Sequence, residues 1–149
     1  RRRRRLMRSL FDVNVLIALL DSAHVGHARA TRWLAQEVAS GWASCPLTQN
    51  GCIRIMSQPA YPGALAAAEV AGRLGEAARD ASHAFWPDDL SLLDEGVLDW
   101  SRVLGHRQVT DHYLLALAVR HRGRFVTLDA RISTAAVAGA KARHLVVLG

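Results

Sequence analysis

Three aspartates occupy positions where a strand ends or a helix begins, and their chemistry depends on whether they meet in space. Asp12 interrupts the apolar run LFDVNVLIAL of residues 10–19, Asp129 follows the stretch RFVTL, and Asp111 opens an apolar helical pattern. Two carboxylates about 4 Å apart repel each other by roughly 4 kcal/mol at an effective dielectric constant of about 20. Converging carboxylates therefore need a cation, and ligand sets made only of oxygen suit Mg²⁺ or Mn²⁺.

The pattern of apolar and polar residues predicts strands and helices that alternate around these acids. The predicted strands span residues 8–11, 42–45, 82–86, 124–128 and 145–148. The predicted helices span residues 13–20, 24–38, 64–78, about 97–104, and 111–121 with Thr110 as its N-cap, and a further helix is capped by Thr48 and ends before Pro59. Alternation of this kind predicts an α/β fold with a mostly parallel central sheet and helices on both faces.

This architecture would bring the three acids together. Right-handed crossovers place the carboxyl ends of parallel strands along one edge of the sheet, and ligands bind at that edge. Asp12 and Asp129 fall on this edge, and Asp111 stands at the start of the helix that leads into the late strand, where the helix dipole eases its charge. A cation held there can polarise a phosphoryl oxygen and lower the pKa of a bound water, which favours metal-dependent phosphodiester hydrolysis.

Each acid also has a purely structural interpretation, and at this point both interpretations stay open. Asp12 can cap the helix that follows it, Asp111 can be a first-turn acid that complements the helix dipole, and Asp129 can be a turn residue. Asp12 is the hardest to explain in this way, because Phe11 and Val13 flank it and a buried carboxylate without a partner is costly.

The size and composition of the chain fit one globular domain. Its 149 residues are enough to bury a sizeable core, with 50% hydrophobic and 21% charged residues. The longest apolar run, residues 13–20, is far shorter than the ~20 residues that cross a bilayer, so we expect a soluble protein and no membrane partner. Cys45 and Cys52 lack a paired metal-ligand spacing, and we expect two buried thiols in a reducing cytosol.

The positive charge is concentrated at one end of the chain. Of the formal net charge of +6, five charges belong to Arg1–Arg5, so the remainder carries only +1. We predict that residues 1–8 form a basic, disordered N-terminal extension and that residues 9–149 form a single domain. The alternative is an arm that pairs with nucleic-acid phosphates, and that alternative stays open.

Four segments, in this order and spacing, resemble the PIN-domain ribonucleases, and most of all the VapC toxins of type II toxin–antitoxin systems. The segments are DVNVLIALLD, CPLTQNGCIRIMSQPAYP, HAFWPDDLSLLD and GHRQVTDHYLLALAVRHRGRFVTLDARI. The resemblance runs from about Leu10 to Asp129 and beyond, which is nearly the whole body of the chain.

The resemblance implies a three-layer α/β/α sandwich that holds Mg²⁺ or Mn²⁺ in an acidic pocket. It also implies a cytoplasmic endoribonuclease that cuts structured RNA, such as transfer or ribosomal RNA, forms a homodimer and is neutralised by a cognate VapB antitoxin. By position, Asp12, Asp111 and Asp129 match the acids expected to bind the metal. Asn14 matches a polar residue that supports the first acid.

One position departs from the family pattern. Many members carry a glutamate in the helix after the second strand, where this chain has Gln49. A glutamine can accept a hydrogen bond from a metal-bound water but brings no charge, so the resemblance implies a less negative pocket and favours a single metal ion. We expect Asn14 and Gln49 to orient ligands and the attacking water. The alternative is a catalytically weak PIN-like module that binds RNA or the antitoxin without cutting.

Overall fold

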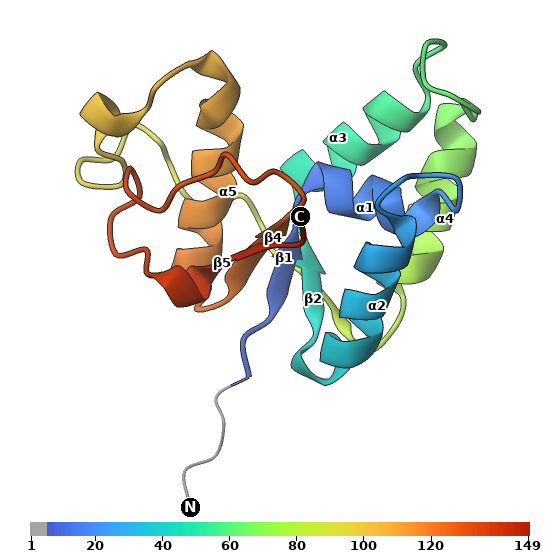
Figure 1. The fold of residues 1–149 in the computed structure, drawn as a ribbon, viewed down its shortest axis with the longest axis horizontal. Helices are drawn as coiled ribbons and strands as arrows, with labels where there is room; N and C mark the ends of the chain where they lie inside the picture. Colours follow the sequence, from blue (N-terminus) through green and yellow to red (C-terminus); the bar gives the residue numbers. More distant parts are fainter. Residues whose placement is uncertain (1–5) are drawn as a thin grey trace, which may run out of the picture.

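The computed structural model describes residues 6–149, so the prediction for Arg1–Arg5 lies outside the described residues. Five short strands form one sheet in the order β3-β2-β1-β4-β5, and every neighbouring pair is parallel (Figure 1). The strands are β1 (Ser9–Phe11), β2 (Trp42–Ser44), β3 (His83–Phe85), β4 (Arg124–Thr127) and β5 (Leu145–Val147). The first strand lies in the middle of the sheet, so the carboxyl end of β1 has β2 on one side and β4 on the other.

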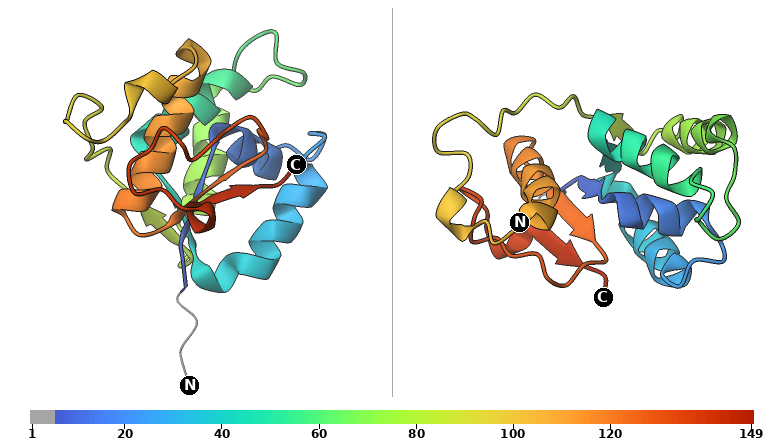
Figure 2. Two further views of the ribbon diagram at one scale, coloured as in Figure 1. Left: turned by 60° about the vertical axis from the view of Figure 1, so that its left-hand side comes forward. Right: turned by 90° about the horizontal axis from the view of Figure 1, so that it is seen from above.

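Helices cover both faces of this sheet. They are α1 (Val13–Leu20), α2 (His27–Glu37), α3 (Pro46–Met56), α4 (Ala67–Ala78) and α5 (Val109–Arg120). Helices α1 to α4 lie on one side of the sheet and α5 lies on the other, together with the long connection from β3 to α5 (Figures 1 and 2). The predicted three-layer α/β/α architecture is therefore confirmed.

Alternating strand residues build a separate core on each face. Leu10 and Phe125 pack toward α5, whereas their sequence neighbours Phe11 and Val126 pack toward α1 and its companions. All four are at most 1% exposed. Successive side chains of a strand point to opposite faces, so a sheet covered on both sides needs apolar residues at every position. Each of these side chains contributes about 1.5–3 kcal/mol through burial, which fixes the strand ends that carry the acids.

The prediction of a helix at residues 97–104 is wrong. Leu98 instead forms an isolated antiparallel bridge with Val137, and the backbone N–H of Asp99 donates to the carbonyl of Ala136 at 2.8 Å. Only a single 3₁₀ turn, Trp100–Arg102, remains helical. Backbone groups that pair with a distant segment cannot also pair four residues apart, so a long-range contact overrides the local pattern.

Two predicted helix caps are also wrong, and helices α2 and α4 each begin three residues later than predicted, at His27 and Ala67. Helix α3 begins at Pro46, which suits the first helical position, and Thr48 lies inside the first turn, where its Oγ1 accepts from the backbone N–H of Cys45 at 3.0 Å. Helix α5 begins one residue before Thr110, directly after a 3₁₀ turn. The shift leaves Asp111 in the first turn, where we expected it.

The amino edge of the sheet is closed by Arg8, which the sequence assigned to the N-terminal extension. Its guanidinium donates to the carbonyls of Trp42 and Ser82, at 3.0 and 2.7 Å. Gly41 has a φ of +77°, and a Cβ there would meet the Arg8 guanidinium, so this crossing requires a glycine. Arg8 thus ties the chain just before β1 to both β2 and β3.

Two predictions from composition can be compared with the described residues. Cys45 and Cys52 are buried and unpaired, as we predicted. Between residues 6 and 149, no helix has both the length and the apolar content needed to cross a membrane.

Candidate metal centre

Asp12 is held at the point where β1 ends and α1 begins. Its backbone N–H donates to the carbonyl of Val126 at 2.9 Å, which continues the pairing of β1 with β4. Its Oδ1 accepts from the backbone N–H of Val13 and its Oδ2 accepts from the hydroxyl of Thr127, both at 2.7 Å. Burial raises the pKa of Asp12, and the two hydrogen bonds oppose that shift. Asp12 therefore caps α1, and its buried carboxylate accepts a hydrogen bond at each oxygen.

Thr127 is the centre of this arrangement, and sequence reasoning missed it. Its side chain is fully buried at the end of β4. The hydroxyl donates to Asp12, while its oxygen accepts from the backbone N–H of Asp129 at 3.1 Å and faces the Asn14 amide at 3.4 Å. A threonine hydroxyl has one donor and two acceptor sites, and all three are used here. The available signal was a hydroxyl at the end of an apolar strand, two residues before an acid.

Asn14 supports the first acid indirectly. Its Nδ2 faces Thr127, and its Oδ1 accepts from the backbone N–H of Leu128 at 3.3 Å. The amide therefore links the first turn of α1 to the residues that follow β4. Its contribution to Asp12 passes through the threonine hydroxyl, which the amide helps to orient.

Asp111 lies half-buried in the first turn of α5. Burial raises the pKa of Asp111 to about 7, and the negative charges of Asp12 and Asp129 act in the same direction, while Arg131 opposes them. No hydrogen bond from the described residues balances its charge. A divalent cation bound beside Asp111 would favour its ionised form.

Asp129 is instead paired with an arginine of its own turn. The Arg131 guanidinium donates from Nε to Oδ1 at 3.0 Å and from Nη2 to Oδ2 at 3.2 Å, and its backbone N–H donates to Oδ1 at 2.9 Å. These contacts lower the pKa of Asp129. Asp129 is therefore also a turn residue, and both of its carboxylate oxygens already accept hydrogen bonds.

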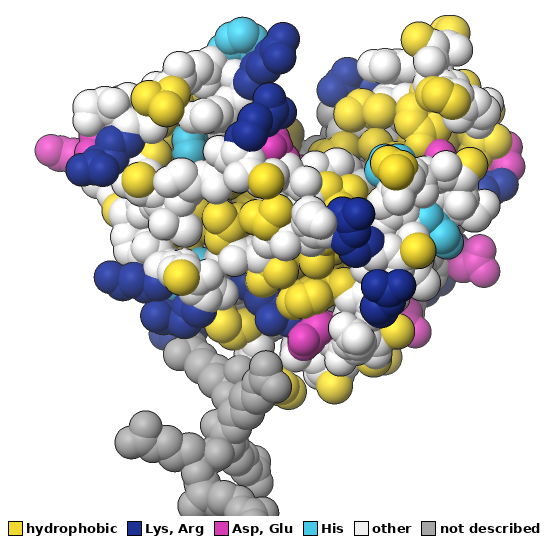
Figure 3. All heavy atoms as spheres, viewed as in Figure 1, with side chains coloured by type: hydrophobic (Ala, Val, Ile, Leu, Met, Phe, Trp, Pro, Cys, Tyr) yellow, Lys and Arg dark blue, Asp and Glu magenta, His cyan; other side chains and the backbone are white. Residues whose placement is uncertain are grey.

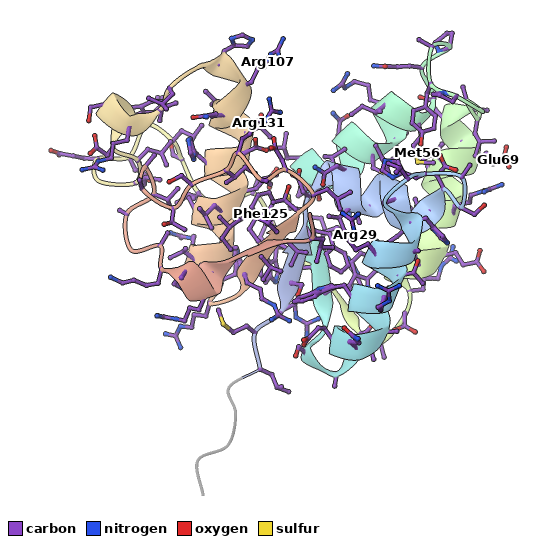
Figure 4. The ribbon with its side chains drawn as sticks, viewed as in Figure 1. Arg29, Met56, Glu69, Arg107, Phe125 and Arg131 are labelled. Atoms are coloured by element: carbon purple, nitrogen blue, oxygen red, sulfur yellow. The ribbon has the colours of Figure 1, made fainter. Side chains whose placement is uncertain are left out.

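A cavity of about 250 Å³ opens beside the outer two acids. Its lining consists of Asp111, Asp129, Arg131, Ile132 and residues 104–108. In Figure 3 the surface is notched between the α5 side and the α3 side, with basic side chains on the α5 wall. Figure 4 shows Arg107 and Arg131 on that wall. Asp12 is absent from the lining and lies deeper, at 7% exposure.

The donor chemistry fits a hydrated divalent cation. Within residues 6–149, no group of three or more His, Cys, Asp or Glu side chains is arranged to hold a metal by itself. Asp12 and Asp129 nevertheless lie close enough to raise the pKa of Asp111, and Asp129 lies close enough to raise that of Asp12. Mg²⁺ keeps several waters and is commonly held through one or two carboxylates, so this looser set of oxygens suits it better than an all-protein cage would.

Gln49 lies in the first turn of α3, after the end of β2, and among the described residues it makes no hydrogen bond to the three acids. Its Nε2 donates to the Ser44 hydroxyl oxygen at 3.0 Å, and that hydroxyl also bonds the His83 ring at 2.8 Å. Helix α3 comes close to α1 at Gly51, where a Cβ would stand 2.7 Å from a methyl group of Val13. Gln49 thus belongs to the same edge of the sheet, but no aspartate is its partner among the described residues.

Comparisons with known proteins agree with this fold. The PIN domain family model matches residues 9–138. Ribonuclease VapC44 of Mycobacterium tuberculosis (strain ATCC 25618 / H37Rv) is 51% identical over 142 residues, which cover 95% of this chain and 100% of the relative. Ribonuclease VapC39 of the same strain is 44% identical over 138 residues, covering 89% and 96%, and Ribonuclease VapC38 is 40% identical over 129 residues, covering 86% and 89%. The chain therefore belongs to the PIN-domain family and, within it, to the VapC group.

Proposed function

We propose that this protein is a Mg²⁺- or Mn²⁺-dependent endoribonuclease toxin that hydrolyses phosphodiester bonds of structured RNA, such as transfer or ribosomal RNA. The observation that carries the proposal is the placement of Asp12, Asp111 and Asp129 at one edge of the sheet, beside a cavity that the last two line. Burial and the charges of the other two acids raise the pKa of Asp111 to about 7. The relatives that bear the name ribonuclease support the same activity.

In this proposal the three aspartates hold the cation directly or through water. A bound divalent ion supplies Lewis acidity and a water of lowered pKa. Thr127 keeps the Asp12 carboxylate in one orientation. Asp111, whose pKa is raised to about 7, would have to be deprotonated to hold the cation. The nucleophile is water, and the displacement at phosphorus is in line. Asn14 and Gln49 orient ligands and water.

Gln49 leaves this edge of the sheet with one negative charge fewer than a glutamate there would give. With an amide where a carboxylate is common in the family, the cluster has one charge fewer, which favours one metal ion over two. The same residue supports a second candidate function, in which the protein is a catalytically weak module that sequesters RNA or an antitoxin.

The partners follow from the VapC group. We propose a VapB antitoxin that neutralises the protein, a homodimer as its own assembly, and a cytoplasmic setting. The last is supported by Cys45 and Cys52, which are both free and buried, as in proteins of reducing compartments.

The test is RNA cleavage by the purified protein with Mg²⁺, with Mn²⁺ and with a chelator. We expect cleavage only with metal, and a loss of at least about 100-fold in Asp12→Asn, comparable to removing one key electrostatic group from an active site. Asp80→Asn is the matched control, because Asp80 is an exposed turn residue whose carboxylate accepts from the Ser82 backbone N–H. If wild type and Asp12→Asn leave RNA equally intact at saturating metal, the nuclease proposal fails and the binding module stands.

A further inference from the structure

The cavity beside the acids has a wall of opposite charge. Asp111 and Asp129 line one part of it, and Arg131 and Arg107 line another. Figure 4 places the two labelled arginines on the same side of the notch, at the α5 layer. Both side chains belong to exposed residues, so their guanidinium groups meet solvent and whatever enters the notch.

An RNA phosphate that approaches three carboxylates meets repulsion that one divalent ion does not fully remove. Three aspartates carry three negative charges when ionised, and a single divalent cation offsets two of them. The phosphodiester brings a further negative charge into the same space. A cationic side chain beside the metal is therefore required for tight binding, and guanidinium groups suit phosphate because they present several donors in a planar fork.

Arg131 is able to change partner at small cost. Its side chain is 80% exposed, whereas that of Asp129 is 25% exposed. Exposed ion pairs contribute little to stability, so breaking this one costs little. While the pair lasts, Nε and Nη2 occupy both oxygens of Asp129, and a metal that binds Asp129 must free at least one of them. Arg131 and the cation therefore compete for the same carboxylate.

Arg107 is held beside this pair by a structured loop. It lies in the 3₁₀ turn His106–Gln108, where the Gln108 side chain accepts from the backbone N–H of Leu104 at 3.3 Å. The ion pairs among the described residues do not include Arg107. Its charge is therefore available to a ligand without any internal exchange.

We propose that Arg131 and Arg107 form a phosphate-binding wall for the RNA backbone, and that Arg131 exchanges Asp129 for the RNA phosphate when the metal binds. This inference rests on the proposed function, since it names the part of the site that receives the substrate. The competing interpretation is an ordinary surface ion pair that only stabilises the turn after β4.

The experiment measures metal and RNA binding separately in Arg131→Gln and Arg107→Gln. Arg102→Gln is the matched control, because Arg102 is an exposed arginine that pairs with Asp99 in another 3₁₀ turn and does not line the cavity. Mn²⁺ affinity is measured by calorimetry without RNA. Affinity for a structured RNA is measured over a range of salt concentrations at saturating Mn²⁺, with the RNA checked to be intact on a gel, and again in chelator, where the Arg131–Asp129 pair stays closed.

The wall predicts opposite effects of one substitution on the two ligands. Arg131→Gln binds Mn²⁺ about 3- to 10-fold more tightly, because a competitor for Asp129 and a repelling charge are gone. The same variant binds RNA about 10-fold more weakly, and its salt slope falls by nearly one unit, as for the loss of one phosphate contact. Arg107→Gln weakens RNA binding in the same way with less effect on Mn²⁺, and Arg102→Gln changes neither.

Failure of the wall and failure of the nuclease are distinguishable. If wild type cleaves RNA while Arg131→Gln and Arg107→Gln bind RNA with the affinity and salt slope of Arg102→Gln, the wall is overturned and the nuclease stands. If wild type binds RNA without cleaving it and the two variants lose affinity, the wall stands and the nuclease is overturned. Unchanged or weaker Mn²⁺ binding in Arg131→Gln overturns the exchange at Asp129.

Discussion

The candidate metal centre has an inner half and an outer half, and the two are built differently. In the inner half, Asp12, Thr127 and Asn14 are linked by hydrogen bonds across the ends of β1 and β4. In the outer half, Asp111 lacks a hydrogen-bond partner among the described residues, and Asp129 holds a mostly exposed arginine. The inner half is part of the fold, whereas the outer half can exchange its partners with ions from solvent.

The same contrast appears in the protonation of three identical side chains. Burial raises the pKa of Asp12 against its hydrogen bonds, the ion pair lowers the pKa of Asp129, and burial with two like charges raises the pKa of Asp111 to about 7. Environment alone separates these values. In the proposed site, Asp111 is therefore the position where a proton and a metal would compete near neutral pH.

Among substitutions in the outer half, we expect Asp111→Asn to have the largest effect on activity. We expect RNA cleavage to fall by at least about 100-fold. We also expect the metal-free protein to melt roughly 2–4 °C higher, because a partly buried charge without a partner is removed. Cleavage assays and thermal melting in chelator check the two effects. A loss of both activity and stability would place Asp111 among the structural residues instead.

The inner half is tested by Thr127→Val, which keeps the shape of the side chain and removes its hydroxyl. The Asp12 carboxylate and the N–H of Asp129 then lose a buried partner, so we expect a loss of about 1–3 kcal/mol of stability and a parallel loss of activity. Denaturant unfolding measures the first effect. Thr31→Val, at an exposed position of α2, is the matched control. Equal stability of the two variants would contradict a structural role for this hydroxyl.

The outer half also predicts a pH dependence. Below a pKa of about 7, Asp111 carries a proton that the metal must displace, so Mn²⁺ affinity should fall up to about 10-fold per pH unit there and level off above it. The folded-state pKa of Asp111 is raised, so the folded metal-free protein binds an extra proton between the unfolded pKa and about 7. Its stability should therefore fall as pH rises through that window. Calorimetry and melting curves from pH 5 to about 8.5 measure both trends, and Asp111→Asn should remove both.

The smallest expected change in metal affinity is that of Gln49→Glu, which tests whether the inner half of the site extends to α3. An added carboxylate should tighten Mn²⁺ binding about 3- to 10-fold if the side chain reaches the cation. The Gln49 side chain now bonds the Ser44 hydroxyl and none of the aspartates, so an unchanged affinity would show that position 49 lies outside the metal site.

The sequence was sufficient for the architecture and for the convergence of the acids, because both follow from alternation and from the geometry of parallel strands. It was not sufficient where distant segments meet. Thr127 and Asp12 are 115 residues apart, and nothing local marks the bond between them. The false helix at 97–104 has the same origin, since Leu98 pairs with Val137 across the chain.

Anomalous diffraction from crystals grown with Mn²⁺ tests the central claim, that the inner and outer halves form one cation site, most directly. We predict one strong peak, within about 2.0–2.2 Å of an Asp111 oxygen and close to Asp12 and Asp129, with Arg131 turned away from Asp129. No peak among these three residues, or a peak held by other side chains while the Arg131–Asp129 pair stays closed, would contradict the claim.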